Sequence, residues 1–407
     1  MRPPAHAGSR REDALRSLKR MNDAAKAAAP VRLCFGAAHV VLHESYRALG
    51  HRLDAPADAA EIRAHVDWDA TMRIRSWLDD NGFGIAEAMD TAQRFFLGWD
   101  SARELIARTS ALRLANGFCA GAGTDHLREV RNLDELAEGV AWQCNEIQRQ
   151  SGIPVVLPMP FLTQHGCGEN DYVAVYRKIL DRVDGPVFLH WLGPMFLPVL
   201  QGYFPGDSLR KILALDRQKV RGIKISMLDD ALEVRLRREL LPHDQIVLTG
   251  DDFHFGRMIL GGDPHATPSP VPPSIQRWTE IAGRKVALGD FSHALLGVFD
   301  AIAEPAGLAL KALARGDAAR FLDLMDPCET LGRHVFCAPT QHYKAGLAFL
   351  AFANGRQDNA MLVRREDRAR DAAHYRRCAE LAVLCSALRD DEHTTERVES
   401  LVQRGPQ

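Results

Sequence analysis

The sequence predicts an α/β protein built as one (β/α)8 barrel, with an N-terminal helical extension and additional helices after the barrel. Three observations predict this fold. From residue 31 onwards, eight short apolar runs alternate with amphipathic stretches, which is the pattern of repeated βα units. The length of 407 residues fits one barrel with extensions. From about residue 296 the chain has the pattern of helices only.

Each predicted strand is a short run of apolar and small residues bounded by turn residues. The eight runs lie at 31–41, 82–90, 113–123, 153–161, 186–191, 219–226, 245–252 and within 284–295. The helices that separate them have apolar residues at helical spacing, at 67–80, 100–112, 132–152, 170–185, 208–215 and 228–240. A Pro-rich segment, HATPSPVPPSIQ (265–276), precedes the last strand and is expected to be a loop.

The chain divides into three segments: a basic helical arm (1–30), the barrel (31–303) and a C-terminal helical extension packed on the barrel (304–407). It carries 51 basic and 53 acidic residues, a balance that favours neither a nucleic-acid partner nor a membrane surface. The sequence shows no long apolar stretch and no signal-peptide core, so we expect a cytoplasmic protein. The eight cysteines are scattered without a C-x-x-C pair and are expected to be reduced thiols.

Polar residues at the C-terminal ends of the strands are the candidates for function, because the active site of a (β/α)8 barrel lies there. We predict that Lys224 and His190 are catalytic. We predict that the following residues bind substrate: Glu87, Asp90, Thr91, Gly250, Asp251, Asp252 and Asp290.

Lys224 is the most informative candidate. It lies between Ile223 and Ile225 inside an apolar strand, where burial disfavours the ammonium form and lowers the pKa. A neutral amine attacks a carbonyl carbon and forms an iminium ion, which serves as an electron sink for breaking a neighbouring bond. The alternative is a structural ion pair of Lys224 with Asp251 or Asp252.

Three blocks of sequence resemble a known family. The segment IKIS (223–226) resembles the strand-six lysine motif of the dihydrodipicolinate synthase/N-acetylneuraminate lyase superfamily. VLTGDD (247–252) is similar to its strand-seven signature, and residues 311–354, with Tyr343-Lys344 opening a helix, look like its C-terminal helices. The resemblance covers roughly residues 215–355; the N-terminal half is similar in layout alone.

The chain looks most like an uncharacterised, divergent bacterial branch of that superfamily. The resemblance implies a class I aldolase-type lyase that acts on a small carbonyl substrate and assembles as a homo-oligomer, a dimer or a tetramer. We expect neither a cofactor nor a metal.

The sequence departs from the family at two places. The strand-two turn that holds a 2-oxo acid carboxylate is replaced by residues 88–92, where Thr91 offers one hydroxyl and Asp90 would repel a carboxylate. The strand-five tyrosine that moves protons is absent. His190 stands in its place as a proton carrier or, alternatively, as a buried structural histidine, and Tyr203 is a second candidate. These departures predict a substrate other than that of dihydrodipicolinate synthase, either a 2-oxo acid or a keto-sugar-like compound.

Two other functions remain as alternatives. A metal-dependent barrel lyase or hydrolase would draw on residues of suitable ligand type, which are Glu87, Asp125, His126, His165, His190, Asp251, His254, Asp290 and His293. A non-catalytic carbohydrate-binding or regulatory protein would keep Lys224 as a structural cation.

Overall fold

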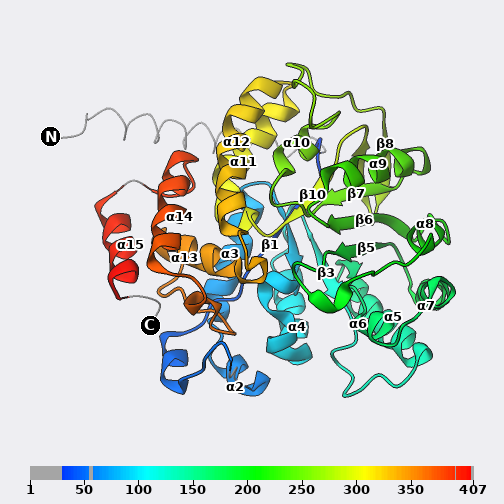
Figure 1. The fold of residues 1–407 in the computed structure, drawn as a ribbon, viewed down its shortest axis with the longest axis horizontal. Helices are drawn as coiled ribbons and strands as arrows, with labels where there is room; N and C mark the ends of the chain where they lie inside the picture. The colour runs from blue at the N-terminus through cyan, green and yellow to red at the C-terminus, as the bar shows by residue number, and fades with distance from the viewer. Residues whose placement is uncertain (1–29, 55–57, 390, 405–407) are drawn as a thin grey trace.

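The barrel predicted from the sequence is present. A computed structural model describes residues 30–54, 58–389 and 391–404, so the predicted arm lies outside the described residues except for Pro30. Eight parallel strands close into a barrel (Figure 1), which confirms the fold class. In chain order they are β1 (Cys34–Ala37), β2 (Gly84–Glu87), β3 (Phe118–Ala122), β4 (Ile153–Val156), β5 (Val187–Leu192), β6 (Val220–Ser226), β7 (Ile246–Thr249) and β10 (His293–Leu296).

A layer of helices surrounds the barrel. Its members are α3 (Trp68–Asp80), α4 (Arg94–Ala111), α5 (Leu133–Arg149), α7 (Glu169–Arg182), α8 (Ser208–Leu213), α9 (Asp230–Leu240), α10 (Phe255–Leu260) and α11 (Phe299–Ala314), with the short α2 (Ala59–Ala64) and α6 (Pro160–Gln164) in the connections. Side-chain caps begin several of them; Asn132, for example, accepts two backbone N–H bonds at the start of α5. Helix α11 packs on β1 and α3, so the predicted boundary at 303/304 falls inside the eighth barrel helix.

Strand alternation decides which side chains face the barrel interior. Ile223 and Ile225 of β6 belong to the core between the strands and the helices, so Lys224 between them faces inward. The interior is filled by a second cluster that includes Phe35, Val155, Phe188, Leu248 and Leu295.

A hairpin that the sequence did not predict adds to the interior cluster. Strands β8 (Arg277–Ile281) and β9 (Arg284–Leu288) pair antiparallel, and the turn residues Ala282 and Gly283 have φ of 50° and 75°, as a tight hairpin turn requires. The apolar residues Ile281, Val286 and Leu288 join the barrel interior.

The hairpin covers the N-terminal end of the barrel. Arg284 Nη1 donates to the carbonyl of Asn116, just before β3, and Arg221 at the start of β6 donates to Thr279 Oγ1. The predicted eighth strand therefore needs a correction, because 284–288 belongs to the hairpin and the barrel strand β10 begins at His293. The Pro-rich segment 265–276 is irregular, as predicted.

The C-terminal helices extend the barrel on one side. They are α12 (Ala318–Val335), α13 (Lys344–Ala353), α14 (Ala372–Leu384) and α15 (Glu392–Arg404), and Figure 1 shows α13–α15, in orange and red, gathered beside the barrel. Phe321, Phe349 and Tyr375 share one apolar core with Phe299 of α11. None of the helices in the described ranges has the length and apolar character needed to cross a bilayer.

Candidate active site

Lys224 lies at the centre of the candidate site. Its Cα is in register with His190 on β5 and with Leu248 on β7, and its side chain is half-buried. Gly250 follows β7 directly against it: a Cβ at Gly250 would lie 2.9 Å from Lys224 Cε and 2.2 Å from Ser226 Oγ. Glycine at position 250 therefore leaves the space that the lysine occupies.

The electrostatic surroundings of Lys224 favour a neutral amine. Burial lowers the pKa of Lys224, and the nearby Asp252, Asp90 and Cys119 oppose that shift without cancelling it. In the described part of the chain, no side chain lies within ion-pair or hydrogen-bond distance of its Nζ. The structural ion pair with Asp251 or Asp252, considered above, is therefore not formed.

Asp252 is the acid that interacts most strongly with Lys224. It is buried and accepts a hydrogen bond from the backbone N–H of Val298 at 3.3 Å. Burial raises the pKa of Asp252, while Lys224 acts in the opposite direction. The two groups together thus favour an amine next to a protonated acid over two buried charges.

Asp251, unlike Asp252, makes its contacts within the turn after β7. Its carboxylate accepts hydrogen bonds from the backbone N–H groups of Phe253 and His254, at 2.8 and 3.2 Å, and His254 Nδ1 lies 2.9 Å from it. These contacts fix the turn after β7. Asp251 holds the turn that presents Asp252 rather than facing Lys224 itself.

His190 lies beside Lys224 and is 3% exposed. Its Nε2 is 3.4 Å from Ser226 Oγ, and its Nδ1 is buried without a partner among the described residues. Burial and the charge of Lys224 hold the pKa of His190 well below its usual value, so the imidazole is neutral. Tyr203 lies elsewhere, in the strand–helix core, where it accepts a hydrogen bond from the Met159 N–H at 3.0 Å.

Thr91 and Asp90 lie in a short turn after β2 and meet residues of the C-terminal extension. Thr91 Oγ1 and the Tyr343 hydroxyl are hydrogen-bonded at 2.7 Å, and this hydroxyl also lies 3.1 Å from Asp90 Oδ2. Lys344 Nζ donates to the same Asp90 oxygen at 2.9 Å. The charge of Asp90, which the sequence suggested would repel a carboxylate, is therefore balanced by Lys344.

Tyr343 is a site residue that the sequence did not reveal as one. Its ring stacks on Phe336 with a centroid distance of 4.3 Å, and a Cβ at Gly297, directly after β10, would lie 3.0 Å from its Cε2. The tyrosine therefore reaches the C-terminal end of the barrel. Burial raises the pKa of Tyr343, as do Asp90 and Asp252, which keeps the phenol protonated.

Two predicted substrate-binding residues are not brought to the barrel mouth. Glu87 faces the helix layer, where Arg75 donates two hydrogen bonds of 2.9 Å to it and Thr109 donates a third. Burial would raise the pKa of Glu87, but Arg75 lowers it overall. Asp290 precedes β10, because strand eight begins later than predicted, and it pairs with Arg237 and Arg238.

The residues proposed above as possible ligands of a metal in the barrel make contacts with other protein groups. Asp125 pairs with Arg94, His126 stacks on Trp142, and His293 contacts the Leu33 N–H at the N-terminal end of β10. Within the described ranges, these residues form no group of three ligands close enough to share an ion.

Comparison with solved structures shows which fold the chain shares. A monomeric dihydrodipicolinate synthase variant matches with a TM-score of 0.59 at 13% identity, over 88% of this chain and 99% of that chain. Dihydrodipicolinate synthase from Agrobacterium tumefaciens matches with a TM-score of 0.53 at 14% identity, over 91% and 98%. N-acetylneuraminate lyase from Fusobacterium nucleatum matches with a TM-score of 0.52 at 12% identity, over 78% and 88%. These similarities confirm the fold that the three sequence blocks implied.

Sequence comparison leads to the family itself. No curated protein matches the sequence. The family model described as "Protein of unknown function (DUF993)" matches residues 1–405, nearly the whole chain, and the chain belongs to that family.

Proposed function

We propose that the protein is a Schiff-base-forming lyase, an aldolase or a dehydratase, that acts on a 2-oxo acid or keto-sugar-like carbonyl compound through Lys224. The observation that carries the proposal is the half-buried Lys224 at the inner face of β6, which has no ion-pair partner among the described residues, a lowered pKa and a buried acid as its electrostatic neighbour. The lyases among the solved structures of the same fold support this class of reaction.

In the proposed reaction, neutral Lys224 Nζ attacks the carbonyl carbon of the substrate and forms a carbinolamine. Loss of water, with a proton from a nearby acid such as Asp252, gives the iminium ion. In C–C cleavage, a base takes the proton of the substrate hydroxyl and the iminium accepts the electron pair of the breaking C–C bond, which gives a carbonyl fragment and an enamine; protonation of the enamine carbon restores the iminium. In dehydration, a base takes the α-proton of the iminium, and the resulting enamine expels the neighbouring hydroxyl, protonated by an acid, as water and leaves an unsaturated iminium. Water then hydrolyses the iminium, which releases the product and returns the amine. Thr91 and the backbone at Gly250 are proposed to hold the polar end of the substrate.

Two groups are proposed to move protons. His190 is neutral next to Lys224, so it serves as an acceptor that becomes charged only during turnover. Tyr343 is protonated and hydrogen-bonded to Thr91, so it serves as a donor on the opposite side of the site. Asp90 and Lys344 hold this phenol in place by their own contacts.

Borohydride trapping tests the proposal directly. The protein is reduced in the presence of a panel of 2-oxo acids and keto sugars, and the adduct is located by intact mass and peptide mapping. We expect one adduct, at Lys224, that is lost in Lys224→Ala and kept in Lys285→Ala, whose lysine is exposed on the hairpin. No labelling, under conditions that label a known Schiff-base aldolase, would overturn the proposal. Turnover that survives Lys224→Ala would instead favour the metal-dependent alternative.

A further inference from the structure

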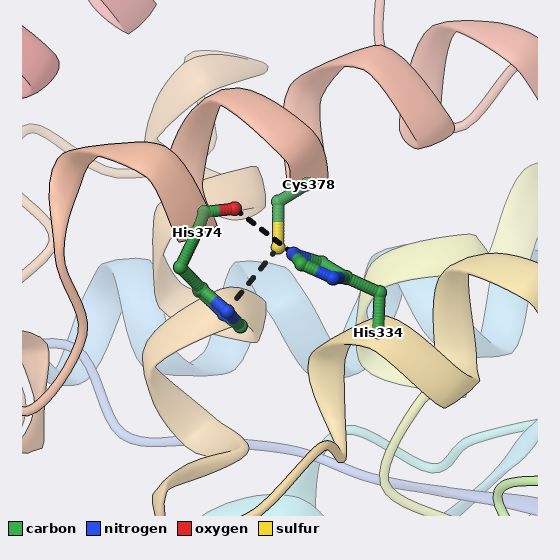
Figure 2. Close-up of side chains that lie close together, drawn as sticks. All are labelled: His334, His374 and Cys378. Atoms are coloured by element: carbon green, nitrogen blue, oxygen red, sulfur yellow. Dashed lines mark hydrogen bonds between the residues drawn. The ribbon is translucent and has the colours of Figure 1, made fainter.

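Two helices of the C-terminal extension each bring one histidine and one cysteine to the same place. His334 lies in the last turn of α12 and Cys337 follows that helix, while His374 and Cys378 are one turn apart on α14. Residues four apart on a helix share a face. Figure 2 shows the side chains of His334, His374 and Cys378 converging between the two helices. The spacing in the sequence is H-x2-C (334–337) followed by H-x3-C (374–378). This pattern offers two cysteine thiolates and two imidazoles as ligands.

The donor atoms are close to one another. One possible ligand atom from each of His334, His374 and Cys378 lies within 4.8 Å of the other two. Cys378 Sγ is 3.6 Å from His374 Nε2, and Cys337 Sγ is 3.9 Å from His374 Nδ1. Ligand atoms of a tetrahedral zinc ion with bonds of about 2.0–2.3 Å are about 3.3–3.8 Å apart. The ligand atoms of His334, His374 and Cys378 are therefore near the spacing of ligands on one ion, whereas Cys337 lies at the other nitrogen of the His374 ring and must change rotamer to join them.

Burial and charge suit a thiophilic cation. Cys378 is fully buried and His374 is 9% exposed. Two thiolates and two neutral imidazoles around a divalent ion carry no net charge, so a filled site adds no positive charge next to Arg370.

We propose that His334, Cys337, His374 and Cys378 bind one structural zinc ion. Four protein ligands close the coordination sphere, which is typical of a structural rather than a catalytic zinc site. In binding, His334 exchanges its 3.0 Å contact with the His374 carbonyl for the ion. Cys337 and Cys378 lie at different nitrogens of His374, so binding of both sulfurs to one ion requires the half-buried Cys337 side chain to change its orientation.

The position of this site connects it to the barrel mouth. The segment from Cys337 to Tyr343 starts at the cluster and ends at the tyrosine that contacts Thr91. Arg370 donates hydrogen bonds to the carbonyls of Cys337, Ala338 and Pro339 along it. A zinc ion at the cluster would anchor the start of this segment. This consequence for Tyr343 rests on the proposed function, whereas the metal site does not.

Metal analysis of the intact protein tests the site. The full chain is purified without metal-affinity steps, and bound zinc is measured by mass spectrometry after exhaustive dialysis. We expect one zinc ion per chain, and we expect cobalt in its place to show the thiolate charge-transfer band and the strong visible bands of a tetrahedral sulfur site. Removal of the ion should lower the melting temperature, and its return should restore it.

Ligand variants and matched controls separate this site from adventitious binding. Cobalt affinity should fall by about 100-fold or more in Cys378→Ser and in the half-buried Cys337→Ser. It should be unchanged in Cys385→Ser, which alters another cysteine at the end of α14, and in His393→Gln on α15. No bound zinc in protein supplied with the ion, or equal binding by the ligand and control variants, would overturn the proposal. Because no substrate is involved, this result is independent of the trapping of Lys224.

Discussion

At the scale of single residues, the candidate site depends on the effect of burial on the pKa values of a basic and an acidic side chain. Burial lowers the pKa of Lys224 and raises that of Asp252. Each shift disfavours a charge, so burial favours the neutral amine of Lys224 and the protonated acid of Asp252. His190 on the adjacent strand is neutral for the same reason.

The Tyr343→Phe variant tests the assigned proton donor. The ring still stacks on Phe336, so the fold should be retained and Lys224 should still form the borohydride adduct. Without the hydroxyl, kcat for the substrate found by trapping should fall by about 10²–10⁴-fold. Tyr375→Phe, which removes a buried hydroxyl bonded to the Asp367 carbonyl, is the matched control and should leave kcat unchanged. Equal kcat in wild type and Tyr343→Phe would exclude the phenol from proton transfer.

Single residues also show where prediction from sequence ends. Lys224 was predicted because a lysine between two isoleucines in a barrel strand can face only inward or into the helix layer. Glu87 was predicted at the mouth because it is a polar residue at the end of the second apolar run. The four residues of β2 are all buried, so no alternation of polar and apolar residues shows which face each side chain takes. Tyr343 is separated from Thr91 by 252 positions, and no local pattern reports such a contact.

At the scale of elements, the first seven strands were found because parallel barrel strands are continuous apolar runs between polar helices. The eighth was misplaced because β9 has the same composition, as one of its faces also enters the barrel interior. Pairing with β8 depends on the tertiary contacts of Arg284 and Arg221 at the N-terminal end of the barrel. Because the eighth strand was predicted too early, Asp290 was expected after its C-terminal end, whereas it precedes β10.

A buried glutamate between α9 and the strands β7 and β10 predicts a pH dependence of the stability. Glu233 of α9 accepts hydrogen bonds from Thr249 and Ser292, and burial raises its pKa to about 8. The folded state therefore keeps a proton that the unfolded chain releases above about pH 4.5. This contribution to stability is present at low pH and is lost as pH rises from about 4.5 to about 8, by on the order of 3–5 kcal/mol.

Glu233→Gln should remove that pH dependence. The amide stays neutral, so relative to wild type the variant should gain stability between about pH 5 and about pH 8.5. Urea unfolding at both pH values measures the difference, and the exposed Glu280→Gln on β8 is the control. A difference between variant and wild type that is the same at both pH values would show that Glu233 ionises normally.

At the scale of the whole molecule, the barrel and the C-terminal extension share the candidate site. The barrel supplies Lys224, His190 and Thr91, and the extension supplies Tyr343 and Lys344. The homo-oligomer implied by the family resemblance stays a prediction, and sedimentation of the purified protein tests it. The cytoplasmic location also stays a prediction.

Shared packing predicts that the barrel and the extension unfold together. The core between strands and helices continues from β1 through α11 to α14 and α15, and buried polar contacts cross the junction, including His39 to Gln357 at 2.6 Å. Separating the two parts would expose this core and break the Asp90–Lys344 pair, whose lysine side chain is buried. We therefore expect one calorimetric transition, coincident with the loss of helical signal and of tryptophan fluorescence. Weakening the junction by Lys344→Met should lower the temperature of that single transition without splitting it. Two resolved transitions in the wild-type protein would instead show that residues 31–314 fold as an independent barrel, and that the extension docks on it as a separate unit.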